Sequence, residues 1–346
     1  MSNGQIRLAL ALVLTMTLCA CVKLPQGVYY EVKTPEYTIV DYSNALIEGE
    51  IEFHGSTDLY DAEYHKNNMR VEIKWGEDPN ALTNNIACTL NTVSGFASYP
   101  TVSFNANING LEDGNVYYYS VRIIYGSEDP YTIPPLEFFI LPKGPVNLDL
   151  SSGNVWSATN LGAMNPEEDG FFYAWGETEP KSSGELYNWS DYKWCGGSNT
   201  TIKKYCTDSS WGKVDGKTVL DAEDDAATLA LGAKWQIPSC VDWNELLVEC
   251  EWAFGKYNGI EGHFIRSKKD LNNPKKVIFI PYSGLINEGT HELEHYSGSY
   301  WSNNLASDWA SDCAYVLGVD SVSHSLYSSS GGRCSGRPIR PVQKAQ

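Results

Sequence analysis

The chain has 346 residues, a formal net charge of −18 and an isoelectric point near 4.7. A chain this acidic repels the phosphates of nucleic acids, so nucleic acid is excluded as the expected partner. The charge is also repelled by anionic membrane surfaces, and we expect it to serve solubility. Aromatic residues make up 12% of the chain, and Gly, Ser, Asn and Asp occur in short clusters. This composition predicts many short strands joined by turns.

The first twenty residues predict a signal peptide. Arg7 is the only charge before an apolar run over residues 8–18. Spanning a bilayer takes about 20 apolar residues, so the run is too short for a membrane helix and has the size of a signal-peptide core. A signal peptide places the mature chain in a compartment where disulfides can form.

The sequence LCAC at residues 18–21 resembles the lipobox of bacterial lipoproteins. The resemblance implies that residues 1–20 are removed and that lipid chains on Cys21 hold the mature protein to a membrane. Residues 21–28 then form a tether. The two residues after Cys21 are Val22 and Lys23, and neither is the aspartate that retains lipoproteins in the inner membrane. We therefore expect an outer-membrane lipoprotein, and exposure at the cell surface is one of the alternatives.

Residues 29–141 predict a β-sandwich. Residues 71–75 alternate with the period of a half-buried strand, residues 76–80 form a turn, and residues 116–123 form a strand with aromatic residues on one face. About seven such runs indicate two packed sheets. The sequence LEDGNVYYYSVRIIYG followed by LEFF resembles the Tyr-rich strands of fibronectin type III domains, a group with the immunoglobulin-like (Ig-like) sandwich.

The prolines and glycine of residues 141–145 predict a linker to a second domain over residues 146–343. That domain contains VNLDLSSGNVWSATNLGAMNPEEDGFFYAWGETEP, VLDAEDDAATLALGAKWQIPSCVDWNELLVECEW, VIFIPYSGLI, GSYWSNN and GRPIRPV. In this order they resemble the Fibrobacter succinogenes major paralogous domain, frequent in lipoproteins of Bacteroides-like bacteria. The resemblance implies a C-type-lectin-like α+β fold similar to that of formylglycine-generating enzymes. Ser239 as N-cap predicts a helix over residues 241–250, and residues 221–231 suggest another.

His291, Glu292 and His295 form the HExxH sequence in which zinc peptidases place two His one helical turn apart. Gly289 before the motif and YSGS after it favour a hairpin tip over a helix. In a strand the two His would share a face about 13 Å apart, too far for one ion. We therefore expect no catalytic residue, no metal and no cofactor, and a zinc metallopeptidase is the least favoured alternative.

Seven cysteines remain beyond Cys19 and Cys21, and six of them lie after residue 190. We expect Cys195 to pair with Cys206 and Cys313 with Cys334, which leaves Cys88 as a free thiol. Formylglycine-generating enzymes use reactive cysteines, but Asp312 beside Cys313 would raise its pKa, so a structural disulfide is favoured over oxidase chemistry.

Acidic clusters at residues 167–169 and 221–225 could offer oxygen ligands to Ca²⁺, but neither has the spacing of an EF-hand loop. Charges at a helix N-terminus explain Asp221 and Asp224 better.

The segment from Ser299 to Arg333 is dense in aromatic and hydrogen-bonding side chains, which recognition surfaces use, and in C-type-lectin-like folds it often forms the ligand face. We expect a non-catalytic binding or adhesion module for a glycan or protein. The alternative is a structural or fimbrial accessory protein of the envelope. The expected ligand-binding residues are Asn303, Asn304, Asp308, Trp309, Asp312, Asp320, His324 and Tyr327.

Overall fold

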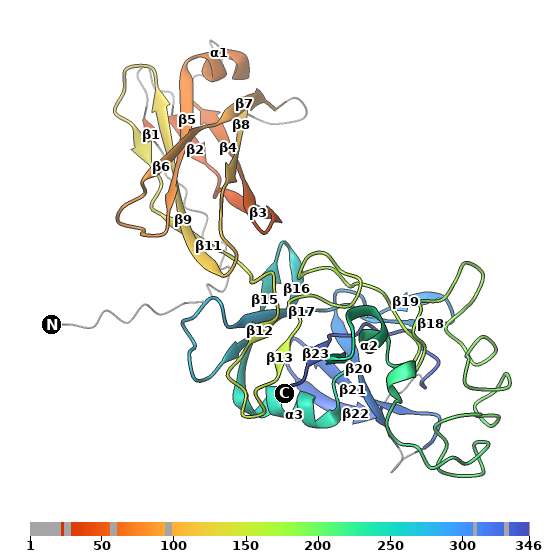
Figure 1. Cartoon of the computed structure of the whole chain (residues 1–346). Coiled ribbons are helices and arrows are strands. Elements are labelled where there is room, and N and C mark those ends of the chain that lie inside the picture. Colours follow the sequence, from red (N-terminus) through yellow and green to blue (C-terminus); the bar gives the residue numbers. More distant parts are fainter. Residues whose placement is uncertain are drawn as a thin grey trace. The chain divides into compact units, whose positions relative to one another are not determined.

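The structure is a computed structural model that describes residues 22–23, 29–55, 61–93, 99–306, 310–328 and 332–345. The chain folds into two compact units, divided at the Ile140–Leu141 bond (Figure 1). Both units consist mainly of antiparallel strands, which confirms the predicted mainly β fold. Within the described residues, every helix is too short or too polar to cross a bilayer.

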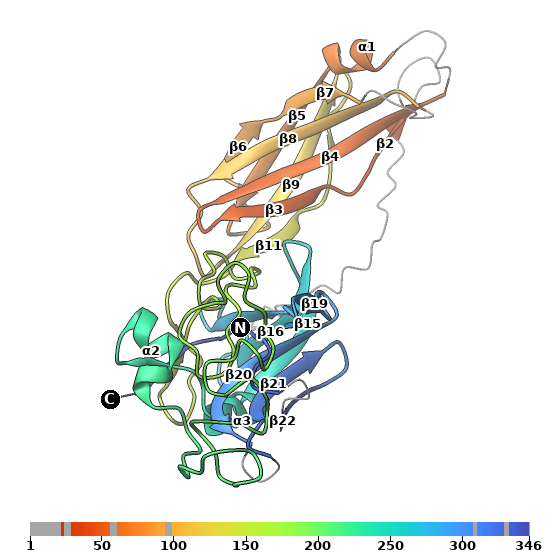
Figure 2. The same ribbon diagram turned by 90° about the vertical axis from the view of Figure 1, so that its right-hand side faces the viewer.

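The larger sheet of the first unit is built around β4, whose partners on either side are β2, β3 and β8. Figure 2 shows β3, β4 and β8 side by side. Buried Ile47, Ile51 and Phe53 alternate along the inner face of β4, as the period of a strand requires. The strands of this sheet are β1 (Val22–Lys23), β2 (Tyr29–Val32), β3 (Glu36–Asp41), β4 (Asn44–His54), β7 (Thr89–Thr92) and β8 (Thr101–Asn109).

The second sheet of this unit has β9 at its centre, paired with β5, β10 and β11. Phe53 of the first sheet lies 5.9 Å from Tyr125 of the second, ring centre to ring centre, so the core lies between the sheets. The strands predicted over residues 71–75 and 116–123 are confirmed. The elements are α1 (Ala62–Asn67), β5 (Met69–Gly76), β6 (Asn84–Ala87), β9 (Asn115–Tyr125), β10 (Tyr131–Thr132) and β11 (Leu136–Ile140).

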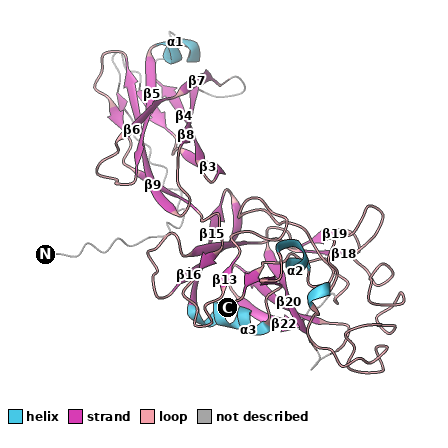
Figure 3. Ribbon diagram, in the orientation of Figure 1, coloured by secondary structure: helices cyan, strands magenta, loops and turns pink. Residues whose placement is uncertain are grey.

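The second unit contains small antiparallel sheets joined by long loops, which Figure 3 shows in pink. Trp156 in β13 pairs with Val342 in β23, so the start and the end of this unit lie in one sheet. The strands are β12 (Val146–Asn147), β13 (Val155–Trp156), β14 (Trp235–Gln236), β15 (Cys250–Tyr257), β16 (Ile260–Ser267), β17 (Val277–Pro281), β18 (Leu285–Asn287), β19 (Thr290–Glu292), β20 (Ser297–Leu305), β21 (Ala314–Asp320), β22 (His324–Ser328) and β23 (Val342–Gln343).

The helix predicted after Ser239 is confirmed as α3 (Cys240–Glu249), with a capping box between Ser239 and Asp242. Trp243 of α3 packs against Trp156 with ring centres 4.8 Å apart, and both are fully buried. The second predicted helix is divided into η3 (Ala222–Asp224) and α2 (Ala226–Leu231). The break occurs at Asp225, which has an extended backbone and caps α2 through its side chain.

Three buried arginines near the C-terminus hold the long loops. Arg340 donates to the carbonyl oxygens of Ala158 and Phe279, and Arg333 donates to that of Tyr205. The guanidinium of Arg337 lies 4.5 Å from the centre of the Trp301 ring. The carbonyl oxygens of Ala158 and Tyr205 lie in loops and thus receive charged donors, which stabilises loops that would otherwise bury unpaired oxygens.

Candidate functional site

Most of the predicted ligand-binding residues that the structure describes make intramolecular contacts. Asn304 accepts a hydrogen bond from the backbone N–H of Cys240 at the start of α3, at 2.8 Å. Asn303 is 6% exposed, and its backbone bonds Leu220 and Pro238. These two residues therefore position the loops around β20, and their side chains offer little surface to a ligand.

Asp312 and Asp320 also have partners within the chain. Asp312 accepts from the side-chain amide of Asn199 at 3.0 Å. Asp320 accepts from the backbone N–H groups of Val322 and Ser323, which closes the turn between β21 and β22. The predictions for Asp308 and Trp309, like that for Cys21, fall outside the described residues.

His324 lies in an aromatic cluster, which we call the His324 cluster, formed by Trp252, Phe254, His263 and His324. The His324 ring stacks on Trp252 at 4.6 Å with an angle of 8° between the planes. His263 lies 5.7 Å from His324, and Phe254 is 42% exposed. Strands β15, β16 and β22 contribute these rings, so two separate sheets meet here.

Burial determines the charge of the two histidines in this cluster. It lowers the pKa of His263 to about 4, with a further contribution from His324, while the charge of Asp320 acts in the opposite direction. Burial also lowers the pKa of His324. Both rings are therefore neutral at pH 7, and the cluster presents an aromatic surface. Tyr327, on the same strand as His324, is 43% exposed.

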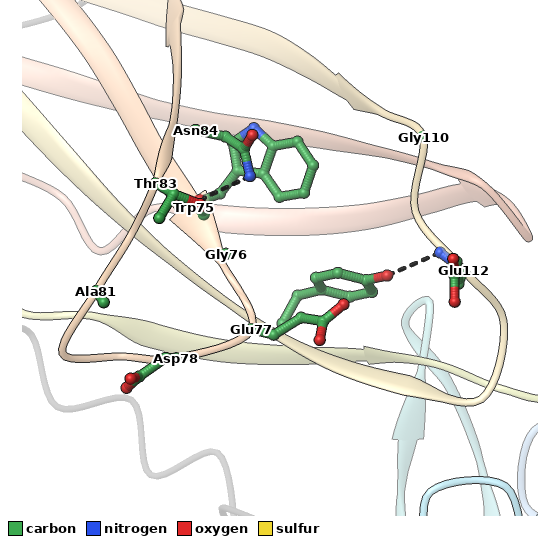
Figure 4. Close-up of a pocket in the computed structure, with 10 residues that line it drawn as sticks. Trp75, Gly76, Glu77, Asp78, Ala81, Thr83, Asn84, Gly110 and Glu112 are labelled. Carbon is green, nitrogen blue, oxygen red and sulfur yellow. Dashed lines mark hydrogen bonds between the residues drawn. The ribbon is translucent and has the colours of Figure 1, made fainter.

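The first unit contains an open pocket of about 570 Å³, which we call the Trp75 pocket (Figure 4). This volume lies within the range of small-molecule sites. The pocket forms where β5 ends and β6 begins, beside the loop that follows β8. Its lining consists of Trp75, Gly76, Glu77, Asp78, Ala81, Thr83, Asn84, Gly110, Glu112 and Tyr117.

Two hydrogen bonds, marked in Figure 4, shape the Trp75 pocket. The amide of Asn84 donates to the carbonyl oxygen of Trp75 at 3.3 Å, and the backbone N–H of Glu112 donates to the hydroxyl of Tyr117 at 2.8 Å. The Trp75 ring is half-buried and lies 6.1 Å from that of Tyr117. The pocket thus joins aromatic rings to exposed polar side chains from two separate loops.

The charge of the Trp75 pocket selects among ligands. Glu77, Asp78 and Glu112 contribute three carboxylates, and the described lining contains no Lys or Arg. Carboxylates accept hydrogen bonds from hydroxyl groups and repel anions, so neutral polyhydroxylated or cationic ligands fit this pocket. The sequence did not predict this pocket, because the alternating pattern of residues 71–75 indicates only that Trp75 is part of a half-buried strand.

The predicted disulfides are wrong for the described residues, because the structure has all seven cysteines after Cys21 as thiols. The sulfur of Cys195 donates to the carbonyl oxygen of Trp189 at 2.8 Å, and that of Cys206 to the oxygen of Asp208 at 3.1 Å. Cys334 lies in one buried cluster with Cys195, and burial raises the pKa of Cys334 to about 12. Proximity in sequence therefore did not identify which cysteines come together.

Carboxylates of the acidic cluster at residues 221–225 form ion pairs with Lys204. The ammonium nitrogen of Lys204 lies 2.7 Å from a carboxylate oxygen of Asp221 and 2.5 Å from one of Asp224. The hydrogen bonds from Lys204 and Lys217 lower the pKa of Asp221 to about 2. Asp221 is the N-cap residue of η3 and Asp224 lies in its first turn, as predicted for charges at a helix N-terminus, and both also form ion pairs with Lys204.

The HExxH segment is no helix: His291 and Glu292 lie in β19, and the chain then turns through positive φ angles at Leu293 and His295. The turn makes the estimated separation of 13 Å wrong, because both imidazoles contact the carboxylate of Glu294. His291 Nδ1 lies 3.3 Å from one of its oxygens, and His295 Nε2 lies 3.7 Å from the other.

No family model and no curated protein matches this chain. Among solved structures, the sensor domain of the anti-sigma factor RsgI4 from Pseudobacteroides cellulosolvens covers 34% of this chain and 99% of its own, at 12% identity and a TM-score of 0.22. A DUF4426 family protein from Pseudomonas aeruginosa covers 36% and 97%, at 8% identity and 0.21. The cycloalternan-forming enzyme of Listeria monocytogenes covers 91% and 30%, at 8% identity and 0.26. These TM-scores are too low to indicate a shared fold.

Proposed function

We propose that this chain is a cell-envelope lipoprotein that binds a neutral glycan without catalysing its conversion. The lipobox-like sequence supports the lipid anchor on Cys21 and the placement in the outer membrane. The first unit acts as an Ig- or fibronectin type III-like sandwich, and the second as a C-type-lectin-like domain of the major paralogous type. Two facing antiparallel sheets support the first assignment, and the confirmed helix α3 supports the second.

The observation that carries this proposal is the Trp75 pocket, whose lining combines aromatic rings with acidic side chains. An aromatic face stacks on the C–H groups of a sugar ring, while carboxylate and amide oxygens bind its hydroxyls. The absence of Lys and Arg from the described lining disfavours sialylated and other acidic sugars. Exposed Asn84 lies at the start of β6 and exposed Glu112 on the loop after β8, so they can hold a ligand from two sides.

The His324 cluster is the second place where the ligand could bind, and it retains the proposed role of the C-terminal face. Its rings are neutral at pH 7 and Phe254 is exposed, so it offers stacking area. The side chains of Asn304, Asp312 and Asp320 are committed to hydrogen bonds within the chain and that of Asn303 is buried, and for this reason we favour the Trp75 pocket.

A glycan array with the mature chain tests the proposal. We expect binding to neutral glycans, and the Glu112→Gln substitution should weaken it at least tenfold, because a hydrogen bond to a charged group contributes about 1.5–3 kcal/mol. Glu128→Gln removes the same charge from an exposed turn of the same unit outside the pocket and should leave binding unchanged.

The same array separates the two surfaces. If Phe254→Ala abolishes binding and Glu112→Gln does not, the ligand binds the His324 cluster. If the folded chain binds no glycan, a structural role in the envelope replaces glycan binding.

A further inference from the structure

Three side chains that could ligate a metal converge where the HExxH segment turns. Ligand atoms of Asp169, His291 and Glu294 all lie within 4.8 Å of one another. Asp169 comes from a distant loop, whereas His291 lies in β19 of the hairpin with β18 and Glu294 follows that hairpin. Residues far apart in sequence therefore share one small volume, which a helical HExxH motif would not produce.

The spacing of these donors suits a small divalent cation. Ligands at about 2.0–2.2 Å from a tetrahedral zinc ion lie about 3.3–3.6 Å from one another. The distance from His291 Nδ1 to the nearer carboxylate oxygen of Glu294 is 3.3 Å. His295 Nε2 lies 3.7 Å from the other oxygen of the same carboxylate and does not belong to the group of three.

The orientation of the His291 ring points to a cation as well. Its Nε2 lies 2.7 Å from the carbonyl oxygen of Ser283, and because a carbonyl only accepts, Nε2 carries a proton. In the neutral ring the lone pair is then on Nδ1, which faces the Glu294 carboxylate. Two electron-rich atoms this close require a proton or a metal ion between them. Metal-binding His residues characteristically donate their other N–H to such a carbonyl.

Ser283 organises the second ligand too. Its hydroxyl hydrogen-bonds Asp169, and Ser283 itself is fully buried. Phe172 packs edge-on against the His291 ring at 5.0 Å. One buried residue thus orients both Asp169 and His291, whereas Glu294 and His295 are 44% and 57% exposed in their side chains and leave a path for an ion from solvent.

We propose that Asp169, His291 and Glu294 form a binding site for a divalent transition-metal ion of the zinc class. Mixed imidazole and carboxylate donors suit such ions, whereas Ca²⁺ and Mg²⁺ favour oxygen ligands alone. The donor set differs from that of zinc peptidases, because Glu294 replaces the second motif His as a ligand and the exposed Glu292 lies in β19, outside the group of three. The ion would tie the β18–β19 hairpin to the loop of Asp169.

The contrast with the cluster of Asp221, Glu223 and Asp224 supports this assignment. That cluster also brings three potential ligands together, but Lys204 lies among them and neutralises their charge. Among the described residues, His291 and His295 are the basic side chains near Asp169 and Glu294. A metal ion would supply the positive charge that a lysine provides at the other cluster.

Zinc titration of the chelator-stripped full chain, prepared without a polyhistidine tag, tests the site by competition with a chromophoric chelator. We expect one zinc ion per chain. Asp169→Asn and Glu294→Gln keep side-chain shape and should each weaken binding at least tenfold. Glu292→Gln is the matched control and should bind zinc like the wild type.

Two outcomes would overturn the site. If the wild type binds no zinc, or if Glu294→Gln binds it as tightly as the wild type, Glu294 is only the ion-pair partner of a protonated His291. If His295→Ala impairs zinc binding while Asp169→Asn does not, the ligands are the two His of the HExxH motif. Because Glu294 is exposed, its variant should fold, and circular dichroism checks this.

Discussion

At the scale of single residues, His263 shows how position determines chemistry. It is 4% exposed, lies between Trp252 and Tyr282, and its Nδ1 is 3.2 Å from the hydroxyl of Tyr282. A charged imidazole would lose most of its hydration here, so the folded chain keeps it neutral. The pattern GHF in a strand indicates only that one of these side chains faces inward.

We expect His263 to make the folded chain less stable in mild acid. Its pKa is about 4 when folded and about 6.5 when unfolded, so the stabilisation is complete above pH 6.5 and is lost as the pH falls toward 4. The loss between pH 7.5 and pH 5 should be roughly 2 kcal/mol. Urea unfolding of wild type and His263→Gln at both pH values measures it.

The glutamine variant retains a hydrogen-bonding side chain but does not titrate. His324 and Asp320 remain in it and contribute acid sensitivity of their own, because the pKa of each is lowered. The difference between the two proteins therefore isolates His263. An equal acid-induced loss in both would show that His263 does not remain neutral.

At the scale of elements, the sequence predicted the helices and strands whose formation depends on residues close together in the chain. Helix α3 follows from a serine cap and apolar residues at helical spacing, and both act within one or two turns. Strands β5 and β9 follow from alternation. The cysteine pairs and the roles of Asn303 and Asn304 could not be predicted, because their partners, such as Cys240, come from distant segments that only the complete fold brings near.

The candidate sites show the same limit. Trp75 and Glu112 meet in a pocket only because β5 and the loop after β8 lie side by side. The HExxH motif indicated metal chemistry, but the local sequence could not reveal that Asp169 would join it or that the chain would turn at Leu293. His324 was predicted, whereas its stacking partner Trp252 was missed because it lies on another sheet.

The cap of α3 gives a prediction at this scale. The Ser239 hydroxyl accepts from the backbone N–H of Asp242 at 3.2 Å and donates to its carboxylate at 2.6 Å. Ser239→Ala should reduce the free energy of unfolding by about 1 kcal/mol, because it leaves an N–H of the first turn unpaired. Ser239→Thr keeps a hydroxyl and should lose much less. Equal losses in urea unfolding would mean that packing, and not the cap, is measured.

At the scale of the whole molecule, the two units each have their own core. In the first, Phe53 and Ile73 are fully buried between two sheets, and in the second, Trp243 of α3 packs against Trp156. The first unit ends with β11 at Ile140, and Leu141 donates its backbone N–H to the hydroxyl of Tyr257 in the second. The Ile140–Leu141 bond is thus where the chain can be divided without cutting a strand.

We expect residues 22–140 and 141–346, expressed separately, to fold and to unfold cooperatively. Both exceed the size below which domains usually need disulfides or metals to fold alone. Each fragment and the full chain are heated and followed by circular dichroism. The midpoint temperature of unfolding of each fragment should match that of the corresponding transition in the full chain within a few degrees. A first unit that is unfolded alone would show that its core is incomplete without the second unit. Since the Trp75 pocket is lined only by residues of the first unit, a folded fragment 22–140 should also retain whatever glycan binding the full chain has.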